Sequence, residues 1–273
     1  MAARIVYTDL DGTMVGPRGS FWHTAARELT ADPAATLLDL HRSGVPLVLV
    51  SGRTFEQVVE AARIFAADGT IAELGATIAW DAGRGVHRMR GDMPEEFGDR
   101  APMEVMTELG IVEELIAAHP GRLEWHAPWH ATHTADALLR GRVDPLSVDA
   151  WLAERGVGWL SLKDNGALPT TTRMTLQPDA TPPRVYHLMP RGISKGAAIA
   201  WDLQRRGLSA EDAVAIGDSV SDLEMAPAVG RLWITANGAA VDGMAELLGA
   251  VPNAVVTEGA MGEGWAEAVR ASL

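Results

Sequence analysis

Residues 7–13 read Tyr-Thr-Asp-Leu-Asp-Gly-Thr, and the rest of the predicted fold is organised around this stretch. It closes a short run, residues 4–8, that is rich in β-branched and aromatic residues and therefore favours a strand. The run ends at Asp9 and Asp11, with Gly12 directly after them. Ligands of open α/β sheets bind beyond the carboxyl ends of the strands, so we expect chemistry here. Carboxylate oxygens suit hard ions such as Mg²⁺, although Asp and Gly also form ordinary turns.

Three later segments also carry polar residues at the predicted end of a strand or start of a helix. Ser51 follows the apolar run 45–50, which is typical of a buried strand. Lys195 stands just ahead of an Ala-rich helical pattern. The segment 217–222, Gly-Asp-Ser-Val-Ser-Asp, follows another apolar run, residues 213–216. Strands that alternate with helices in this way predict an α/β fold with a parallel sheet and helices on both faces.

In this order, the Asp-x-Asp-Gly-Thr run, the strand-end serine, the lysine and the Gly-Asp-x-x-x-Asp segment closely resemble the four motifs of the haloacid dehalogenase (HAD) superfamily. The resemblance implies a doubly wound HAD hydrolase core formed by residues 1–81 and 189–273. Residues 82–188 form an insertion large enough to be a domain. Its position and length match the α/β cap, or specificity domain, of the Cof-like (type IIB) branch. Sucrose-phosphatase-like and mannosyl-3-phosphoglycerate-phosphatase-like proteins are relatives in that branch.

The resemblance implies roles for the first two carboxylates. Asp9 becomes the nucleophile that takes the phosphoryl group as an aspartyl-phosphate intermediate. Asp11 protonates the leaving alkoxide and then deprotonates water. The dehalogenases of the superfamily lack this second Asp, because a halide leaving group needs no proton. Asp11 therefore favours a phosphatase.

The resemblance also implies a Mg²⁺ site. Its ligands are the Asp9 carboxylate, the Asp11 backbone carbonyl and Asp218, with Asp222 either binding the ion or supporting those ligands. Many relatives carry Asn where this chain has Ser221, so whether Ser221 replaces a ligand stays open.

The resemblance implies that the serine motif and the lysine motif bind the phosphate. The Ser51 hydroxyl and the amides around Gly52, at a helix start, are expected to hold phosphoryl oxygens. Lys195 supplies a fixed cation that stabilises charge in the transition state. Taken singly, Ser51 is explained equally well as a helix cap and Lys195 as a solvated lysine.

These observations predict a Mg²⁺-dependent phosphatase acting on a small phosphomonoester, either a sugar phosphate or a phosphorylated sugar acid. A large cap favours small substrates, because closure must exclude water around the leaving group. Two alternatives stay open: a phosphomutase, which shares every core motif, and a ligand-binding homologue without turnover.

The composition of the chain limits the classes of molecule that it is expected to bind. The 273 residues include 47% hydrophobic and 22% charged residues, with a formal net charge of -13 and no cysteine. The charge argues against nucleic acid and anionic membranes, and the absence of cysteine excludes disulfides and thiolate metal sites. No apolar run of about 18 residues and no charged-then-apolar leader is found, so we expect a cytoplasmic protein, monomeric or homodimeric.

Several finer expectations concern elements. Residues 73–80 are expected to form a strand pair around a turn, similar to the Glu-Asn-Gly-Ala segment of one HAD branch but with Leu74 in place of Asn. Residues 103–119 are expected to form one amphipathic helix, and residues 173–176 a strand.

A cluster of histidines lies in the insertion. His126, His130 and His133 invite a zinc site, but Pro128 disrupts the helix that would align them. We therefore expect substrate contact or packing. Basic residues of the insertion are expected mainly on solvated surface, with one or two facing substrate: Arg140, Arg142, Lys163 and Arg173.

Overall fold

The structure is a computed structural model that describes residues 2–168 and 174–273. The chain divides into two compact units. Unit 1 comprises Met1–Met89 and Ser194–Leu273, and unit 2 comprises Arg90–Ile193. Unit 1 continues beyond residue 81 because one more strand joins its sheet. The division of labour between a hydrolase core and a specificity cap stays a prediction.

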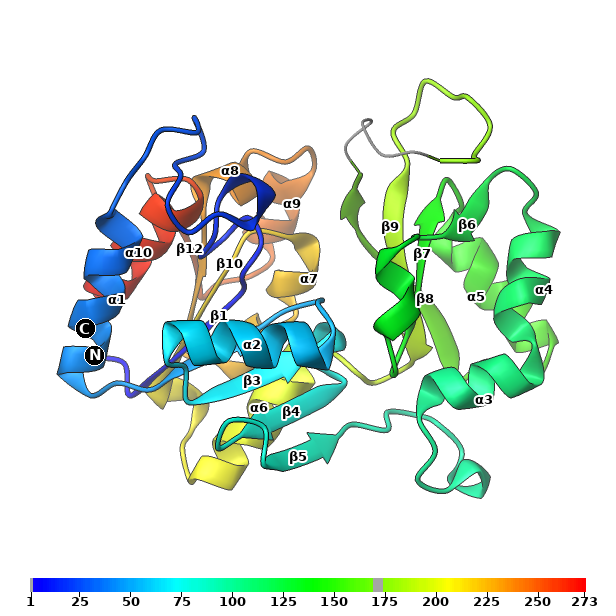
Figure 1. The fold of residues 1–273 in the computed structure, drawn as a ribbon, viewed down its shortest axis with the longest axis horizontal. Coiled ribbons are helices and arrows are strands. Elements are labelled where there is room, and N and C mark those ends of the chain that lie inside the picture. The colour runs from blue at the N-terminus through cyan, green and yellow to red at the C-terminus, as the bar shows by residue number, and fades with distance from the viewer. Residues whose placement is uncertain (1, 169–173) are drawn as a thin grey trace. The chain divides into compact units, whose positions relative to one another are not determined.

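Unit 1 is built on a mainly parallel sheet (Figure 1). Its strands are β1 (Ile5–Thr8), β2 (Leu47–Val50), β3 (Gly69–Ala72), β4 (Thr77–Trp80), β5 (Gly85–Arg88), β10 (Ala213–Gly217), β11 (Arg231–Ile234) and β12 (Ala254–Val256). Within the described residues the order is β12-β11-β10-β1-β2-β3-β4-β5. Neighbours from β12 to β3 run parallel, whereas β4 and β5 pair antiparallel. The predicted α/β fold class is confirmed.

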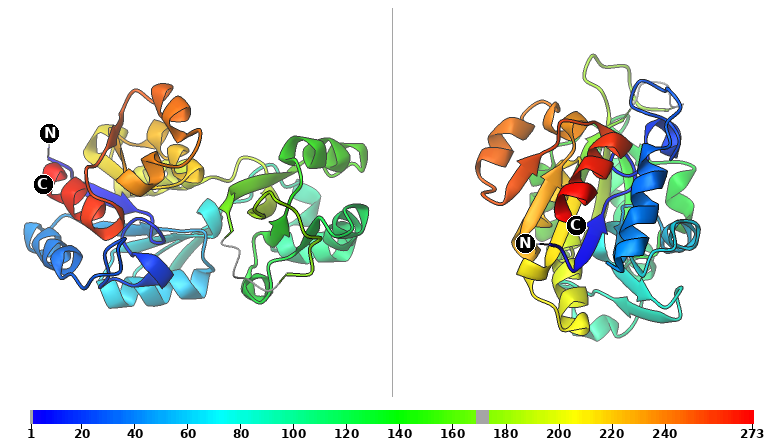
Figure 2. Two further views of the ribbon diagram at one scale, coloured as in Figure 1. Left: turned by 90° about the horizontal axis from the view of Figure 1, so that it is seen from above. Right: turned by 90° about the vertical axis from the view of Figure 1, so that its left-hand side faces the viewer.

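Helices cover both faces of this sheet. They are α1 (Asp32–Ser43), α2 (Phe55–Phe65), α6 (Lys195–Arg206), α7 (Val220–Leu223), α8 (Ala236–Ala239), α9 (Met244–Gly249) and α10 (Met261–Ser272). α1, α2 and α10 pack on one face and α6 on the other. α1 and α10 lie side by side (Figures 1 and 2). Across the described ranges of both units, no helix combines the length and the hydropathy needed to cross a bilayer.

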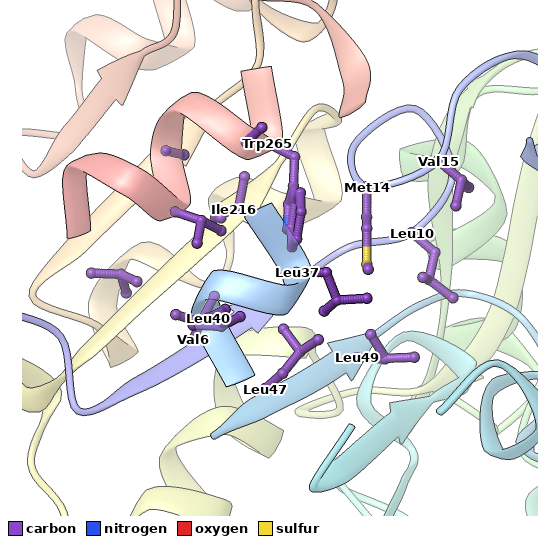
Figure 3. Packing of buried hydrophobic residues seen from close by; sticks show 14 of the residues in the cluster. Val6, Leu10, Met14, Val15, Leu37, Leu40, Leu47, Leu49, Ile216 and Trp265 are labelled. Atoms are coloured by element: carbon purple, nitrogen blue, oxygen red, sulfur yellow. The ribbon is translucent and has the colours of Figure 1, made fainter. Parts of the chain in front are cut away.

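The alternation of side chains along the strands separates two cores. Val6 points to the α1/α10 face, where it joins the fully buried Leu40 and Trp265 (Figure 3). Ile5 and Tyr7 point to the α6 face. Burying one such side chain stabilises the fold by about 1.5–3 kcal/mol, which holds the ends of the central strands in fixed positions.

The predicted strand pair over residues 73–80 is wrong in its first half. Glu73–Gly75 forms a tight turn, and β4 pairs instead with β3. Gly75 has a φ of +109°, and a Cβ atom there would lie 2.2 Å from the Ser194 carbonyl oxygen. Only glycine lets this turn approach the backbone that leads into α6.

Unit 2 is an antiparallel sheet with helices on one face. Its strands are β6 (Leu123–Trp125), β7 (Ala137–Gly141), β8 (Leu160–Ala167) and β9 (Arg184–Pro190), and its helices are α3 (Pro102–Leu109), α4 (Ile111–Ala118) and α5 (Pro145–Glu154). Within the described residues the strand order is β6-β7-β9-β8. Apolar residues of all three helices pack on one face of the sheet, against Leu139, Leu162 and Leu188.

Two predictions for unit 2 fail. Residues 103–119 form α3 and α4 rather than one helix, because Gly110 takes a φ of +64° and ends α3. Of the strand expected at residues 173–176, Arg173 lies outside the described residues and residues 174–176 are not extended into a strand.

Candidate active site

The loop after β1 is held by its own apolar residues. Leu10 and Met14 are fully buried against the core below (Figure 3). The turn between them needs Gly12, whose φ is +88° and whose amide donates to the Val15 carbonyl at 3.0 Å. A Cβ atom at Gly12 would lie 2.3 Å from Asp218 Oδ2. Glycine therefore permits the close approach of the first and last motifs.

Lys195 links two of the predicted carboxylates. Its Nζ donates to Asp9 Oδ1 at 2.8 Å and to Asp222 Oδ1 at 2.6 Å. All three residues are buried. Lys195 opens α6, where the preceding Ser194 caps the helix by accepting from the Ala197 amide at 3.0 Å. The helix start thus fixes the direction of the lysine side chain.

Asp222 organises the loop after β10. Its Oδ2 accepts from the amides of Asp218 and Ser219 at 3.0 and 2.9 Å. The Ser219 hydroxyl donates to the same oxygen at 2.7 Å and lies 2.9 Å from the Ser221 hydroxyl. With Lys195 on the other oxygen, Asp222 accepts bonds on both sides and orients both the loop and the lysine.

Asp218 is held by two side chains from other loops. Thr13 Oγ1 donates to Asp218 Oδ1 at 2.7 Å, and Asn237 Nδ2 donates to Asp218 Oδ2 at 3.3 Å. Asn237 also donates to the Gly12 carbonyl at 2.9 Å. These bonds connect the ends of β1, β10 and β11.

The site carries an excess of negative charge. Burial raises the pKa of the Asp9 carboxyl well above its ordinary value despite Lys195, and the carboxylates of Asp222 and Asp218 add to the rise. Burial, then the charge of Asp222, raises the pKa of Asp218 to about 7. Burial disfavours the charged form of Lys195, yet Asp222 and Asp9 hold the pKa of Lys195 above its ordinary value.

Asp11 lies apart from this buried cluster. Its carboxylate is about half exposed and accepts two bonds from Arg53, from Nε at 2.6 Å and from Nη2 at 2.5 Å. The bond to Asp11 raises the pKa of Arg53 despite partial burial. The bidentate pair fixes the direction of the Asp11 carboxylate.

The strand-end serine lies where it was expected, at the end of β2 beside β1. Ser51 is buried, and its hydroxyl accepts from the Arg53 amide at 3.2 Å. The half-buried Gly52 lies between them. The cap of α2 is Thr54, which accepts from the Gln57 amide. Ser51 is therefore not needed as the helix cap.

Comparisons with known proteins show what the chain is similar to. Residues 167–241 match the haloacid dehalogenase-like hydrolase family. A phosphoglycolate phosphatase of Methanoculleus marisnigri is 25% identical over 228 residues, which are 83% of this chain and 81% of that protein. The resemblance to the HAD superfamily is confirmed. Another phosphoglycolate phosphatase, from Pyrobaculum aerophilum, is 26% identical over 278 residues, covering 100% of this chain and 97% of that protein. The family match and these relatives' names support the predicted phosphatase enzyme.

Solved structures agree on the architecture of this HAD-like chain. The sucrose-phosphatase of Synechocystis sp., solved with sucrose and phosphate, matches with a TM-score of 0.66. The match covers 100% of this chain and 98% of that one at 16% sequence identity. At that identity the likeness shows the fold, which is the fold expected for the Cof-like branch.

The carboxylates of this HAD-like site fit a hard cation. Asp9, Asp218 and Asp222 offer oxygen atoms that all lie within 4.8 Å of one another. Lys195 is the one cation that bonds to this cluster in the described hydrogen bonds, whereas the cluster holds three carboxylates. An all-oxygen set of this kind is what Mg²⁺ prefers.

Three residues of the site were not predicted as functional. Thr13 and Asn237 bind Asp218, and Arg53 binds Asp11. Thr13 and Arg53 lie inside motifs that were recognised. Asn237 follows the carboxyl end of β11, the neighbour of β10, so the strand-end rule could have found it.

Two of the four basic residues of the insertion differ from the surface role expected for them. Arg140 is buried and its Nε donates to Glu124 Oε1 at 2.6 Å. Arg142 donates to the backbone carbonyls of Thr181 and Gln177. Lys163 is half-buried, and Arg173 lies outside the described residues. Arg140 and Arg142 are therefore structural, because their donors are engaged within unit 2.

The predicted histidine cluster is only partly assembled. His126 and His133 are buried, and burial, together with Arg140, lowers the pKa of His126 to about 4. The His130 ring stacks on Trp125 with centroids 5.0 Å apart. This contact fits the expected packing role.

Proposed function

We propose that this chain is a Mg²⁺-dependent phosphatase that hydrolyses a small phosphomonoester through an aspartyl-phosphate. The observation that carries the proposal is the buried cluster in which Lys195 joins Asp9 to Asp222, with Asp218 alongside. A carboxylate held by a fixed ammonium at a strand end is a directed nucleophile. The order and chemistry of these groups are those of the HAD motifs.

The residues divide the reaction into two displacements. A carboxylate oxygen of Asp9 attacks phosphorus, and the bond from phosphorus to the ester oxygen breaks. Asp11 gives its proton to that oxygen, and Arg53 holds Asp11 in position for this transfer. Asp11 then takes a proton from the water that attacks the acyl phosphate, which releases inorganic phosphate and restores Asp9.

Groups around the nucleophile would stabilise the negative charge of the phosphoryl group. Lys195 and the Ser51 hydroxyl would contact phosphoryl oxygens, with the amides near Gly52 assisting. Asp9, Asp218 and the Asp11 carbonyl would hold Mg²⁺, which supplies positive charge between the carboxylates and the phosphate. Because Asp222 already accepts bonds on both oxygens, we expect it to support these ligands.

The substrate class that we propose is a sugar phosphate or a phosphorylated sugar acid. The expected cap position of unit 2 supports a small substrate, and phosphoglycolate is a natural test compound because the relatives above carry that name. Phosphate release from a panel of these esters, with and without Mg²⁺, tests the proposal. A need for a bisphosphate activator would indicate a phosphomutase. No Mg²⁺-dependent release from any ester would favour a ligand-binding protein.

Removing Asp11 gives a result that depends on the leaving group. Asp11→Asn is expected to slow hydrolysis of an alkyl phosphate by about 10²–10⁴-fold, because the departing alkoxide needs a proton. With nitrophenyl phosphate the leaving group is nitrophenolate, which departs without that proton. The first displacement should therefore persist and produce a burst of nitrophenolate. Stopped-flow absorbance measures the burst. Asp39→Asn, at another exposed Arg-paired aspartate, is the control and should behave like the wild type. An equal loss in the rate of the first displacement with both esters would contradict the role of Asp11 as the acid.

Asp218 gives the protein a stability that depends on pH and on Mg²⁺. Its pKa of about 7 lies above the ordinary 3.8, so the protonated form is favoured by the fold. That contribution is complete below about pH 4 and is lost as the pH rises toward 7. We therefore expect chelated protein to have a lower Tm at about pH 8 than at about pH 5. Mg²⁺ should restore the Tm at the higher pH.

The matched variant is Asp218→Asn. The amide keeps an acceptor for Thr13 but carries no charge, so its Tm should be flatter with pH and should not rise with Mg²⁺. Differential scanning calorimetry measures both proteins. A Mg²⁺-induced rise of equal size in the variant would exclude Asp218 as a ligand.

A further inference from the structure

The face of the unit 2 sheet opposite its helices carries buried polar groups. On β7 and β9, Leu139 and Leu188 point to the helix-covered core. The alternation of side chains then places Leu138 and His187 on the other face, where they are directly paired. Asp136 precedes Leu138 by two residues and shares its face. This register brings residues 51 positions apart into contact.

Asp136 joins two imidazoles in the interior of unit 2. Its Oδ1 lies 2.7 Å from His133 Nδ1, and its Oδ2 lies 2.7 Å from His187 Nδ1. Asp136 is fully buried, His187 is 1% exposed and His133 is 8% exposed. The three residues offer ligand atoms that all lie within 4.8 Å of one another. A carboxylate and two imidazoles are side chains that bind metal ions, and the fold already brings them together.

A second observation points to a missing ligand. His126 is 8% exposed, and its Nδ1 is a buried atom without a hydrogen-bond partner among the described residues. His130 Nδ1 is in the same state. The His126 amide donates to the carbonyl of Leu138, the residue paired with His187. Buried polar atoms normally have partners, so the unpartnered nitrogen of His126, a residue on which the charges of His187 and His133 act, indicates a bound group in this part of unit 2.

We propose that unit 2 holds a transition-metal ion, with Zn²⁺ the best match, on His133, Asp136 and His187. Imidazole nitrogens with one carboxylate suit Zn²⁺, whereas Mg²⁺ prefers the all-oxygen set of unit 1. Ligand bonds of about 2.0–2.2 Å to each residue require only small movements from the present separations. The ion takes the place of the protons shared with Asp136. This site is independent of the proposed phosphatase reaction.

Zn²⁺ titration of chelator-treated full-length protein tests the site. By isothermal calorimetry in excess Mg²⁺, the wild type should bind one more Zn²⁺ than His187→Gln, or bind it at least about 100-fold more tightly. His119→Gln is the matched control, because His119 is a half-buried histidine of unit 2 whose side chain bonds to the Leu115 carbonyl in the described hydrogen bonds. Its titration should match the wild type.

A spectroscopic measurement on the wild type tests the site even if the His187→Gln variant does not fold. Co²⁺ in a low-symmetry site with imidazole ligands gives intense visible absorption, whereas Co²⁺ in an all-oxygen octahedral site gives only weak bands. We expect the intense spectrum, and we expect Zn²⁺ to abolish it. Weak bands only, or identical Zn²⁺ titrations of His187→Gln and His119→Gln, would overturn the proposal.

Discussion

Replacing Asp9 by asparagine is expected to reduce phosphate release by at least about 10⁴-fold, because the amide cannot attack phosphorus. The substitution preserves the size of the side chain and an oxygen that can accept from Lys195. KM should change far less than kcat, since Mg²⁺ and phosphate contacts from other residues persist. Steady-state assays on the fastest ester of the panel measure both constants.

The control for this variant is Asp39→Asn, which removes an exposed carboxylate of α1 paired with Arg42. It should keep wild-type activity. Circular dichroism of Asp9→Asn should show an unchanged fold, because the neutral amide avoids the desolvation of a buried charge that raises the Asp9 pKa. A folded Asp9→Asn protein with substantial turnover would rule out covalent catalysis by Asp9.

Replacing Lys195 by methionine is expected to have the largest effect on stability. Lys195 is the cation between Asp9 and Asp222, and all three groups are buried. Removing it leaves two buried carboxylates without their partner, which costs about 3–5 kcal/mol of unfolding free energy near neutral pH. Urea unfolding in the presence of chelator measures the loss. Activity should also fall, since the phosphoryl oxygens lose a fixed cation.

The pH dependence of Lys195→Met separates this charge effect from a packing effect. Without the lysine, which lowers the pKa of Asp9, that pKa should rise further in the folded protein. A raised folded-state pKa adds stability at low pH that is lost as the pH increases, so the gap to the wild type should narrow at about pH 5. A gap that does not change with pH would indicate packing alone.

The strand-end rule explains why much of the site could be predicted from sequence. Asp9, Ser51 and Asp218 each follow an apolar run, and parallel pairing puts the ends of those runs at one edge. Lys195 was found only through the order of the motifs, because a lysine at a helix start is ordinarily solvated. The two hydrogen bonds from Lys195 to Asp9 and Asp222 depend on the packing of α6 against the sheet.

Other features depend on contacts that a linear pattern does not contain. Asn237 reaches Asp218 only because β11 pairs with β10. The apolar pattern over residues 103–119 predicts one helix, but the pattern does not show that Gly110 takes a positive φ and ends α3. The histidine cluster illustrates the same limit. Sequence proximity grouped His133 with His126 and His130, whereas strand register gives it Asp136 and His187 as partners.

The most direct test of the covalent mechanism is to trap the phosphorylated enzyme. Protein mixed with a radiolabelled ester of the panel is quenched in acid, digested and mapped, and the label is challenged with hydroxylamine, which cleaves acyl phosphates. We predict label on the peptide that contains Asp9, and we predict that hydroxylamine releases it. Rapid phosphate release with no label on that peptide, or label on another residue, would contradict the mechanism.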